Sequence, residues 1–81
     1  EKNNPMQNEL RSLIVEITGL KPDFDGSANL YTDLGVPSVK AMQLLMDLEE
    51  KFGVSVPDDD FIEATSLDTL VELIGRLRSS S

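Results

Sequence analysis

The stretch that decides the fold reads DLGVPSVKAM and spans residues 33–42, where a loop leads into a helix. Gly35 permits a backbone turn that other residues resist. Pro37 fixes its own φ and pushes Val36 toward an extended conformation. Ser38 is a favoured residue type at a helix N-terminus, and a regular apolar periodicity follows it. The pattern therefore predicts a hydroxyl at the positive end of a helix, where free N–H groups and the dipole would stabilise an attached anion.

Ser38 has two simpler roles that must be weighed against attachment of an anion. Because serine is among the commonest N-cap residues, the local pattern is also typical of a residue that only caps the helix. A hydrolase that used Ser38 as its nucleophile would need a base partner. The sequence contains no His and no Cys, so only carboxylates could act as that base. Evidence from the rest of the chain is needed to distinguish a capping role of Ser38 from a role as an attachment point.

The size of the chain predicts a single small domain over residues 1–81, with 40% hydrophobic residues to form a core. We expect the ordered core at about residues 6–78, with frayed residues 1–5 and a flexible tail at 79–81. Because Cys is absent, disulfides and thiolate nucleophiles are excluded. No apolar run approaches the roughly 20 residues of a membrane span. No signal-peptide pattern is present, so a cytoplasmic protein is expected.

The charge balance of the chain is strongly acidic, with 15 Asp and Glu against seven Lys and Arg and a net charge of −8. This charge repels phosphate backbones and argues against nucleic-acid binding. It favours partners with basic surfaces and salt-sensitive association, and we expect a monomer. Residues 23–26 match part of a calcium loop but lack the final Glu ligand, and residues 58–60 are typical of a solvated helix start. No metal site is therefore predicted.

The residues after Ser38 predict an amphipathic helix that runs to about Phe52 and ends at Gly53. One face of this helix, an arc of roughly 100°, should contact the core; it carries Ala41, Leu44, Leu45, Leu48 and Phe52. A second apolar stripe faces away from the core and is flanked by two carboxylates; it consists of Val39, Met42 and Met46, with Glu49 and Glu50 beside it. Either another helix covers both faces of a wide core, or the second stripe is an adaptable docking surface.

Three further helices are expected in the rest of the chain. An amphipathic helix follows Met6 and ends near Gly19, before a long polar connection at residues 21–37. The three Asp at residues 58–60 begin a short helix, and Ser66 caps a last helix that runs to about residue 78. The predicted fold class is therefore all-α: a four-helix bundle with three longer helices, one short third helix and a long loop between the first two.

The chain also contains, at matching spacing, DLG at 33–35, Ser38, LLMDLEEKFGV at 44–54, VPD at 56–58 and TSL at 65–67. Over about residues 6–78 this set resembles the acyl carrier protein family. The resemblance implies that Ser38 carries a covalent 4′-phosphopantetheine, which a phosphopantetheinyl transferase attaches from coenzyme A. The cofactor thiol would hold acyl groups as thioesters, so the chain itself is not expected to be an enzyme. Partner docking is implied for Val39, Met42, Met46, Glu49 and Glu50, toward acyl-loading and acyl-processing enzymes with basic surfaces.

The attachment site departs from the usual pattern of that family. Pro37 stands where the family usually has Asp, Lys40 reverses a charge, and Gln43 stands where Glu is frequent. Because charge affects partner choice and association rate, the pathway is left open between fatty-acid, polyketide and specialised lipid biosynthesis, as is the transferase that accepts Pro37. An aminoacyl or peptidyl carrier and an unmodified acidic helical adaptor stay as alternatives.

Overall fold

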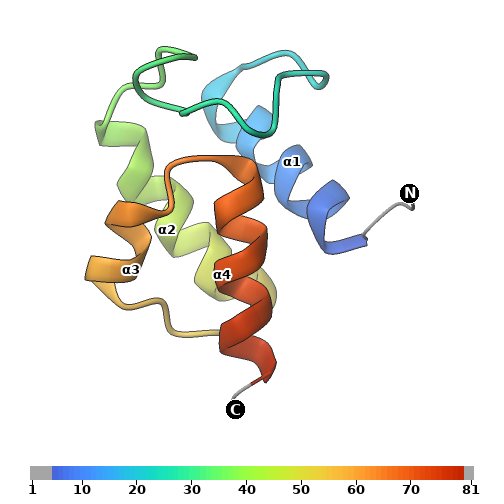
Figure 1. Ribbon diagram of the computed structural model, residues 1–81, viewed down its shortest axis with the longest axis vertical. Helices are drawn as coiled ribbons and strands as arrows, with labels where there is room; N and C mark the ends of the chain where they lie inside the picture. Colours follow the sequence, from blue (N-terminus) through green and yellow to red (C-terminus); the bar gives the residue numbers. More distant parts are fainter. Residues whose placement is uncertain (1–4, 80–81) are drawn as a thin grey trace.

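A computed structural model describes residues 5–79, which form four helices and no strand within that range. In chain order the helices are α1 (Pro5–Thr18), α2 (Val39–Phe52), α3 (Asp58–Glu63) and α4 (Leu67–Ser79). The predicted fold class, with three longer helices and a short third one, is confirmed (Figure 1). None of the helices in residues 5–79 is both long enough and apolar enough to cross a membrane.

The outer limits of the helices differ slightly from the prediction. Helix α1 begins at Pro5, which was expected to be frayed; proline is well tolerated in a first helical turn, where its missing N–H would have no partner. Helix α4 includes Ser79, which was expected in a flexible tail. The same expectations for residues 1–4 and 80–81 lie outside the described residues.

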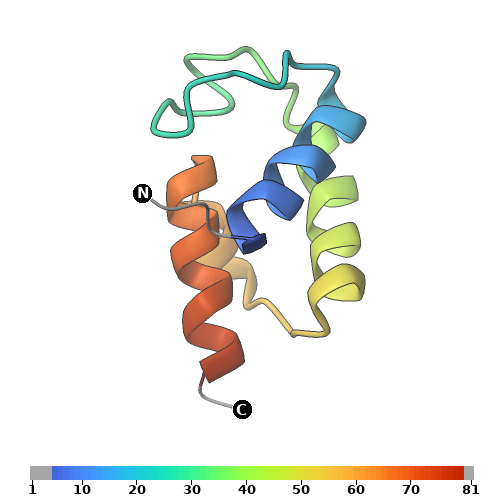
Figure 2. The ribbon, with the colours of Figure 1, turned by 90° about the vertical axis from the view of Figure 1, so that its right-hand side faces the viewer.

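Helix α1 lies between α2 and α4 and packs against both, while the short α3 packs against α4 (Figure 2). The long connection from α1 to α2 crosses one end of the bundle in both views and leads into the start of α2 (Figures 1 and 2). This end of the molecule therefore presents the loop and the first turn of α2 together, which is where Ser38 lies.

The core is formed by apolar residues at helical spacing. Leu10 and Ile14 of α1, Leu48 of α2, and Leu70 and Ile74 of α4 have no exposed surface. Within α2, Leu44 and Leu48 are fully in the core, whereas the rest of the predicted core face is only partly buried against it, namely Ala41, Leu45 and Phe52. The predicted phase of α2 is therefore correct, because its core-facing arc lies where the periodicity put it.

Helices α3 and α4 begin where the sequence predicts. Ser66 caps α4 as expected: its Oγ accepts from the Thr69 N–H at 3.2 Å, and Thr69 Oγ1 accepts from the Ser66 N–H at 3.0 Å. Helix α3 begins at the three Asp as expected, although its N-cap residue is Pro57 and it has no side-chain cap bond. The three Asp occupy the first turn of α3, where they still interact favourably with the helix dipole.

The long loop is held to the bundle by side-chain contacts at its first half. The Arg11 Nη1 donates to the Pro22 and Phe24 carbonyls at 2.9 and 2.6 Å, and its guanidinium lies over the Phe24 ring. Asp25 accepts from the N–H and Oγ–H of Ser27, which lowers the pKa of the Asp25 carboxyl. Residues 25–27 therefore form an ordinary Asx turn. Among residues 5–79, no group of three or more His, Cys, Asp or Glu is placed to hold a metal ion.

Candidate functional site

The loop before Ser38 is folded by its own polar groups. The Asn29 Oδ1 accepts from the N–H groups of Tyr31 and Thr32, and the Asp33 carboxylate accepts from the Asn29 N–H at 3.0 Å. The Leu30 N–H donates to the Thr65 carbonyl at 2.8 Å, which ties the loop to the segment before α4. Because Leu30 is also buried, this segment enters α2 from a fixed position.

The turn into α2 uses a left-handed glycine, as the sequence predicts. Gly35 has φ +75°, a conformation that favours glycine because it lacks a Cβ. The next residue, Val36, is buried, and its N–H donates to the Leu30 carbonyl at 2.9 Å. Together these features bring the chain back out of the core so that Pro37 and Ser38 are exposed.

Ser38 stands at the N-cap of α2, but its hydroxyl makes no cap hydrogen bond. Its backbone is already helical (φ −63°, ψ −23°), whereas a capping side chain usually goes with an extended backbone. The first turn is closed by the backbone instead: the Lys40 N–H donates to the Pro37 carbonyl at 2.9 Å and the Ala41 N–H to the Ser38 carbonyl at 3.0 Å. The alternative in which Ser38 only caps the helix through its side chain is therefore wrong, and its hydroxyl is exposed and makes no hydrogen bond with any of the described residues.

The electrostatic surroundings of the Ser38 hydroxyl suit an anion. The amides of Ser38 and Val39 have no hydrogen-bond partner among the described residues, and the first turn of α2 contains no acidic residue. The exposed Lys40 adds a positive charge next to this end of the helix. A phosphodiester on the Ser38 oxygen would therefore meet a favourable helix dipole and no neighbouring carboxylate within the turn.

Two apolar grooves that share Ala41, Phe61 and Ile62 lie between α2 and α3, and one of them includes Ser38. The first, here called the Ser38 groove, has a volume of about 220 Å³ and is lined by Tyr31, Ser38, Ala41, Phe61, Ile62 and Thr65. The second, here called the Met42 groove, measures about 290 Å³ and is lined by Ala41, Met42, Leu45, Asp58, Phe61 and Ile62. Burial raises the pKa of the half-buried Tyr31, which is one of the residues that line the Ser38 groove. A group attached to Ser38 thus has apolar surface within reach.

The second apolar stripe of α2 is exposed. Val39, Met42 and Met46, here called the α2 ridge, are 72, 70 and 62% exposed. The alternative of a wide core that covers both faces of α2 is therefore wrong. The sequence analysis did not predict the exposure of Ile62 in α3, which is 69% exposed.

The two carboxylates beside the α2 ridge differ in their surroundings. The Glu49 Oε2 accepts from the Val56 N–H at 2.8 Å, so this half-buried side chain holds the loop between α2 and α3. The sequence did not predict this structural role, and partner docking by Glu49 stays a prediction. Glu50 is exposed on the solvent side of α2.

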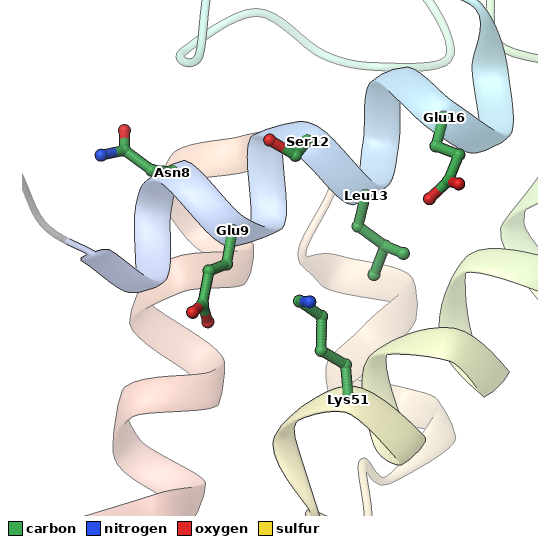
Figure 3. Close-up of a pocket in the computed structure, with 6 residues that line it drawn as sticks. All are labelled: Asn8, Glu9, Ser12, Leu13, Glu16 and Lys51. Carbon is green, nitrogen blue, oxygen red and sulfur yellow. The ribbon is translucent and has the colours of Figure 1, made fainter.

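A polar depression lies on another side of α2, against α1. Figure 3 shows Lys51 of α2 extending toward α1, with Glu9 and Glu16 to either side of it. Leu13 forms the apolar floor between these charged groups. This face of α2 is distinct from the α2 ridge, and the sequence reasoning assigned it no function.

Comparison with known proteins agrees with this geometry. The family described as "Phosphopantetheine attachment site" matches residues 8–74. An acyl carrier protein of Campylobacter hominis is 33% identical over 73 residues, which cover 89% of this chain and 92% of that protein. The chain belongs to the acyl carrier protein family. Members of this family are carriers and not enzymes, and the cofactor that goes with the matched domain is 4′-phosphopantetheine.

The site is chemically compatible with that cofactor. A carrier of this kind needs an accessible oxygen nucleophile that another enzyme can esterify, and the exposed, uncommitted Ser38 hydroxyl meets this need. The absence of Cys from the sequence is no obstacle, because the cofactor supplies the thiol that forms thioesters.

Proposed function

We propose that this chain is a stand-alone acyl carrier protein in which the Ser38 oxygen is the attachment point of 4′-phosphopantetheine. A phosphopantetheinyl transferase would join the Ser38 oxygen to the pantetheine-bearing phosphorus of coenzyme A. The pyrophosphate bond of coenzyme A would break, adenosine 3′,5′-bisphosphate would leave, and a base of the transferase would take the Ser38 proton. The observation that carries this assignment is the exposed Ser38 hydroxyl, which has no cap bond at the start of a helix within the matched region. The cofactor thiol would then hold acyl groups as thioesters.

The α2 ridge is the surface that we assign to partner enzymes. It is apolar, adjacent to Ser38 and rich in Met, whose flexible side chain adapts to different partners. The exposed Glu50 and the overall charge of −8 favour acyl-loading and acyl-processing enzymes with basic surfaces. A monomeric carrier in fatty-acid, polyketide or specialised lipid biosynthesis is consistent with these features, and a cytoplasmic location stays a prediction.

The decisive experiment is the intact mass of the protein after incubation with coenzyme A and a broad-specificity phosphopantetheinyl transferase. We expect the wild-type protein to gain one pantetheinyl group and Ser38→Ala to gain none. Ser12→Ala is the matched control, because Ser12 is also exposed but lies in α1, and it should be modified like the wild type.

Other results would contradict the proposal. If the mass of wild-type protein is unchanged with several transferases, the unmodified adaptor is the better description. If Ser38→Ala still gains the group, the attachment point is another residue. Once the holo protein is made, loading assays with acyl and aminoacyl donors distinguish an acyl carrier from an aminoacyl or peptidyl carrier.

A further inference from the structure

The charges near the α2 ridge are distributed unevenly along the helix. The first turn of α2 has no acidic residue, and the ammonium of Lys40 has no hydrogen-bond or ion-pair partner among residues 5–79. The first carboxylate along α2 is Asp47, which accepts from the Gln43 Nε2 at 3.2 Å. The half of α2 nearest Ser38 therefore presents one free positive charge in a chain whose net charge is −8.

Lys40 lies on the flank of the ridge that faces α1. At about 100° per residue, Lys40 is a quarter-turn around α2 from Val39, on the same side as Lys51, which follows about three turns later. Lys51 lines the depression against α1, and Figure 3 shows it pointing that way. The positive charge of Lys40 is thus close to Ser38 and beside the ridge without being part of its apolar surface.

The opposite flank of the ridge is acidic. Met42 shares a groove with Asp58, and Asp58 begins the first turn of α3, where three consecutive Asp are exposed. Near Ser38, a partner seated on the ridge would therefore meet the positive charge of Lys40 on the α1 side and negative charges on the α3 side. Asp47 lies on the Lys40 flank but two turns further from Ser38, where it accepts from Gln43. Such a pattern fixes the orientation of the partner as well as its identity.

We propose that Lys40 is a specificity-determining residue: the α2 ridge fits an enzyme that presents an apolar pocket to Met42 and Met46, a carboxylate to Lys40 and a basic group toward Asp58. An enzyme with Lys or Arg at the position that meets Lys40 is disfavoured by like-charge repulsion. This inference rests on the proposed function, because it concerns enzymes that approach Ser38.

The test compares Lys40→Glu with Lys51→Glu, since each replacement lowers the net charge of the chain by two. Both side chains are exposed on α2, but Lys51 is about 16 Å further along the helix axis, beyond the screening length of about 8 Å at physiological ionic strength. The measured quantity is kcat/KM for pantetheinylation by a transferase whose active-site rim is basic. Far-ultraviolet circular dichroism checks that both variants are folded.

We expect Lys40→Glu to raise kcat/KM by about three- to tenfold at low salt, with a smaller gain at high salt. Lys51→Glu should stay within about twofold of the wild type. With a transferase variant whose rim Lys and Arg are changed to Glu, we expect the opposite order. The kcat/KM for the wild-type protein should then exceed the kcat/KM for Lys40→Glu.

Equal effects of the two variants would mean that only net charge matters, and the inference would be overturned. No effect of Lys40→Glu, or a decrease with the basic transferase, would overturn it as well. These outcomes differ from failure of the proposed function, in which no transferase would modify Ser38 in any variant.

Discussion

The phase of α2 can be tested by truncating two apolar side chains that are two residues apart. Leu48 is fully buried, whereas Met46 is 62% exposed. Both become Ala in the variants, so helix propensity changes little and in a favourable direction. The position of the α2 ridge, and hence the proposed docking surface, depends on this difference in burial.

The expected cost of Leu48→Ala follows from its burial. Removing a fully buried Leu side chain costs about 2–5 kcal/mol, because the transfer free energy is lost and a cavity is left. A domain of this size has a free energy of unfolding of about 4–12 kcal/mol, so the variant would lose a large part of its stability. Met46→Ala should change it by no more than about 0.5 kcal/mol, as is usual for an exposed position.

Urea unfolding followed by circular dichroism measures both values. With a slope of about 1 kcal/mol per molar urea for a small domain, Leu48→Ala should lower the midpoint by about 2 M or more, and Met46→Ala should barely move it. A cost below about 1 kcal/mol for Leu48→Ala, or a similar cost for the two variants, would show that α2 is rotated and that the ridge is not the exposed face.

Two further predictions concern backbone conformation and pH. Gly35→Ala should destabilise the protein by about 1 kcal/mol because of its positive φ, whereas Gly75→Ala in α4 should stabilise it by about 0.5–1 kcal/mol. Neither added Cβ meets an atom within 4 Å, so the difference reports backbone conformation and not a steric clash. Urea unfolding should therefore show free-energy changes of opposite sign for the two variants. Tyr31 is the only tyrosine, and burial raises its pKa, so its tyrosinate absorbance should appear above the ordinary pKa of about 10. Because the unfolded chain loses this proton first, stability should fall as pH rises past that value; titration of Tyr31 at or below it would contradict the burial.

The features that the sequence predicted correctly are those with a strong periodic or local signal. The apolar spacing of α2 placed Leu44 and Leu48 on the core face and put Met42 and Met46 on a different arc, whose exposure the structure then showed. Gly35 was expected to form the turn before Ser38, and its φ is positive. Such positions are predictable because one physical requirement, either the helical period or a positive φ, determines the residue type.

The features that were missed depend on tertiary contacts. Phe24 and Val36 are buried from loops, where no periodicity marks the inward side. The hydrogen bond from the Val56 N–H to Glu49 joins residues seven positions apart across the end of a helix, and nothing local indicates it. The exposure of Ile62 follows from how the short α3 is oriented on α4, which its six residues do not specify.

The way in which α2 begins affects how readily a cofactor can be attached to the protein or removed from it. Since only main-chain atoms close the first turn, esterification of the Ser38 oxygen breaks no intramolecular contact. An enzyme that adds or removes the cofactor therefore does not need the scaffold to open locally, and attachment costs no folding free energy through lost contacts.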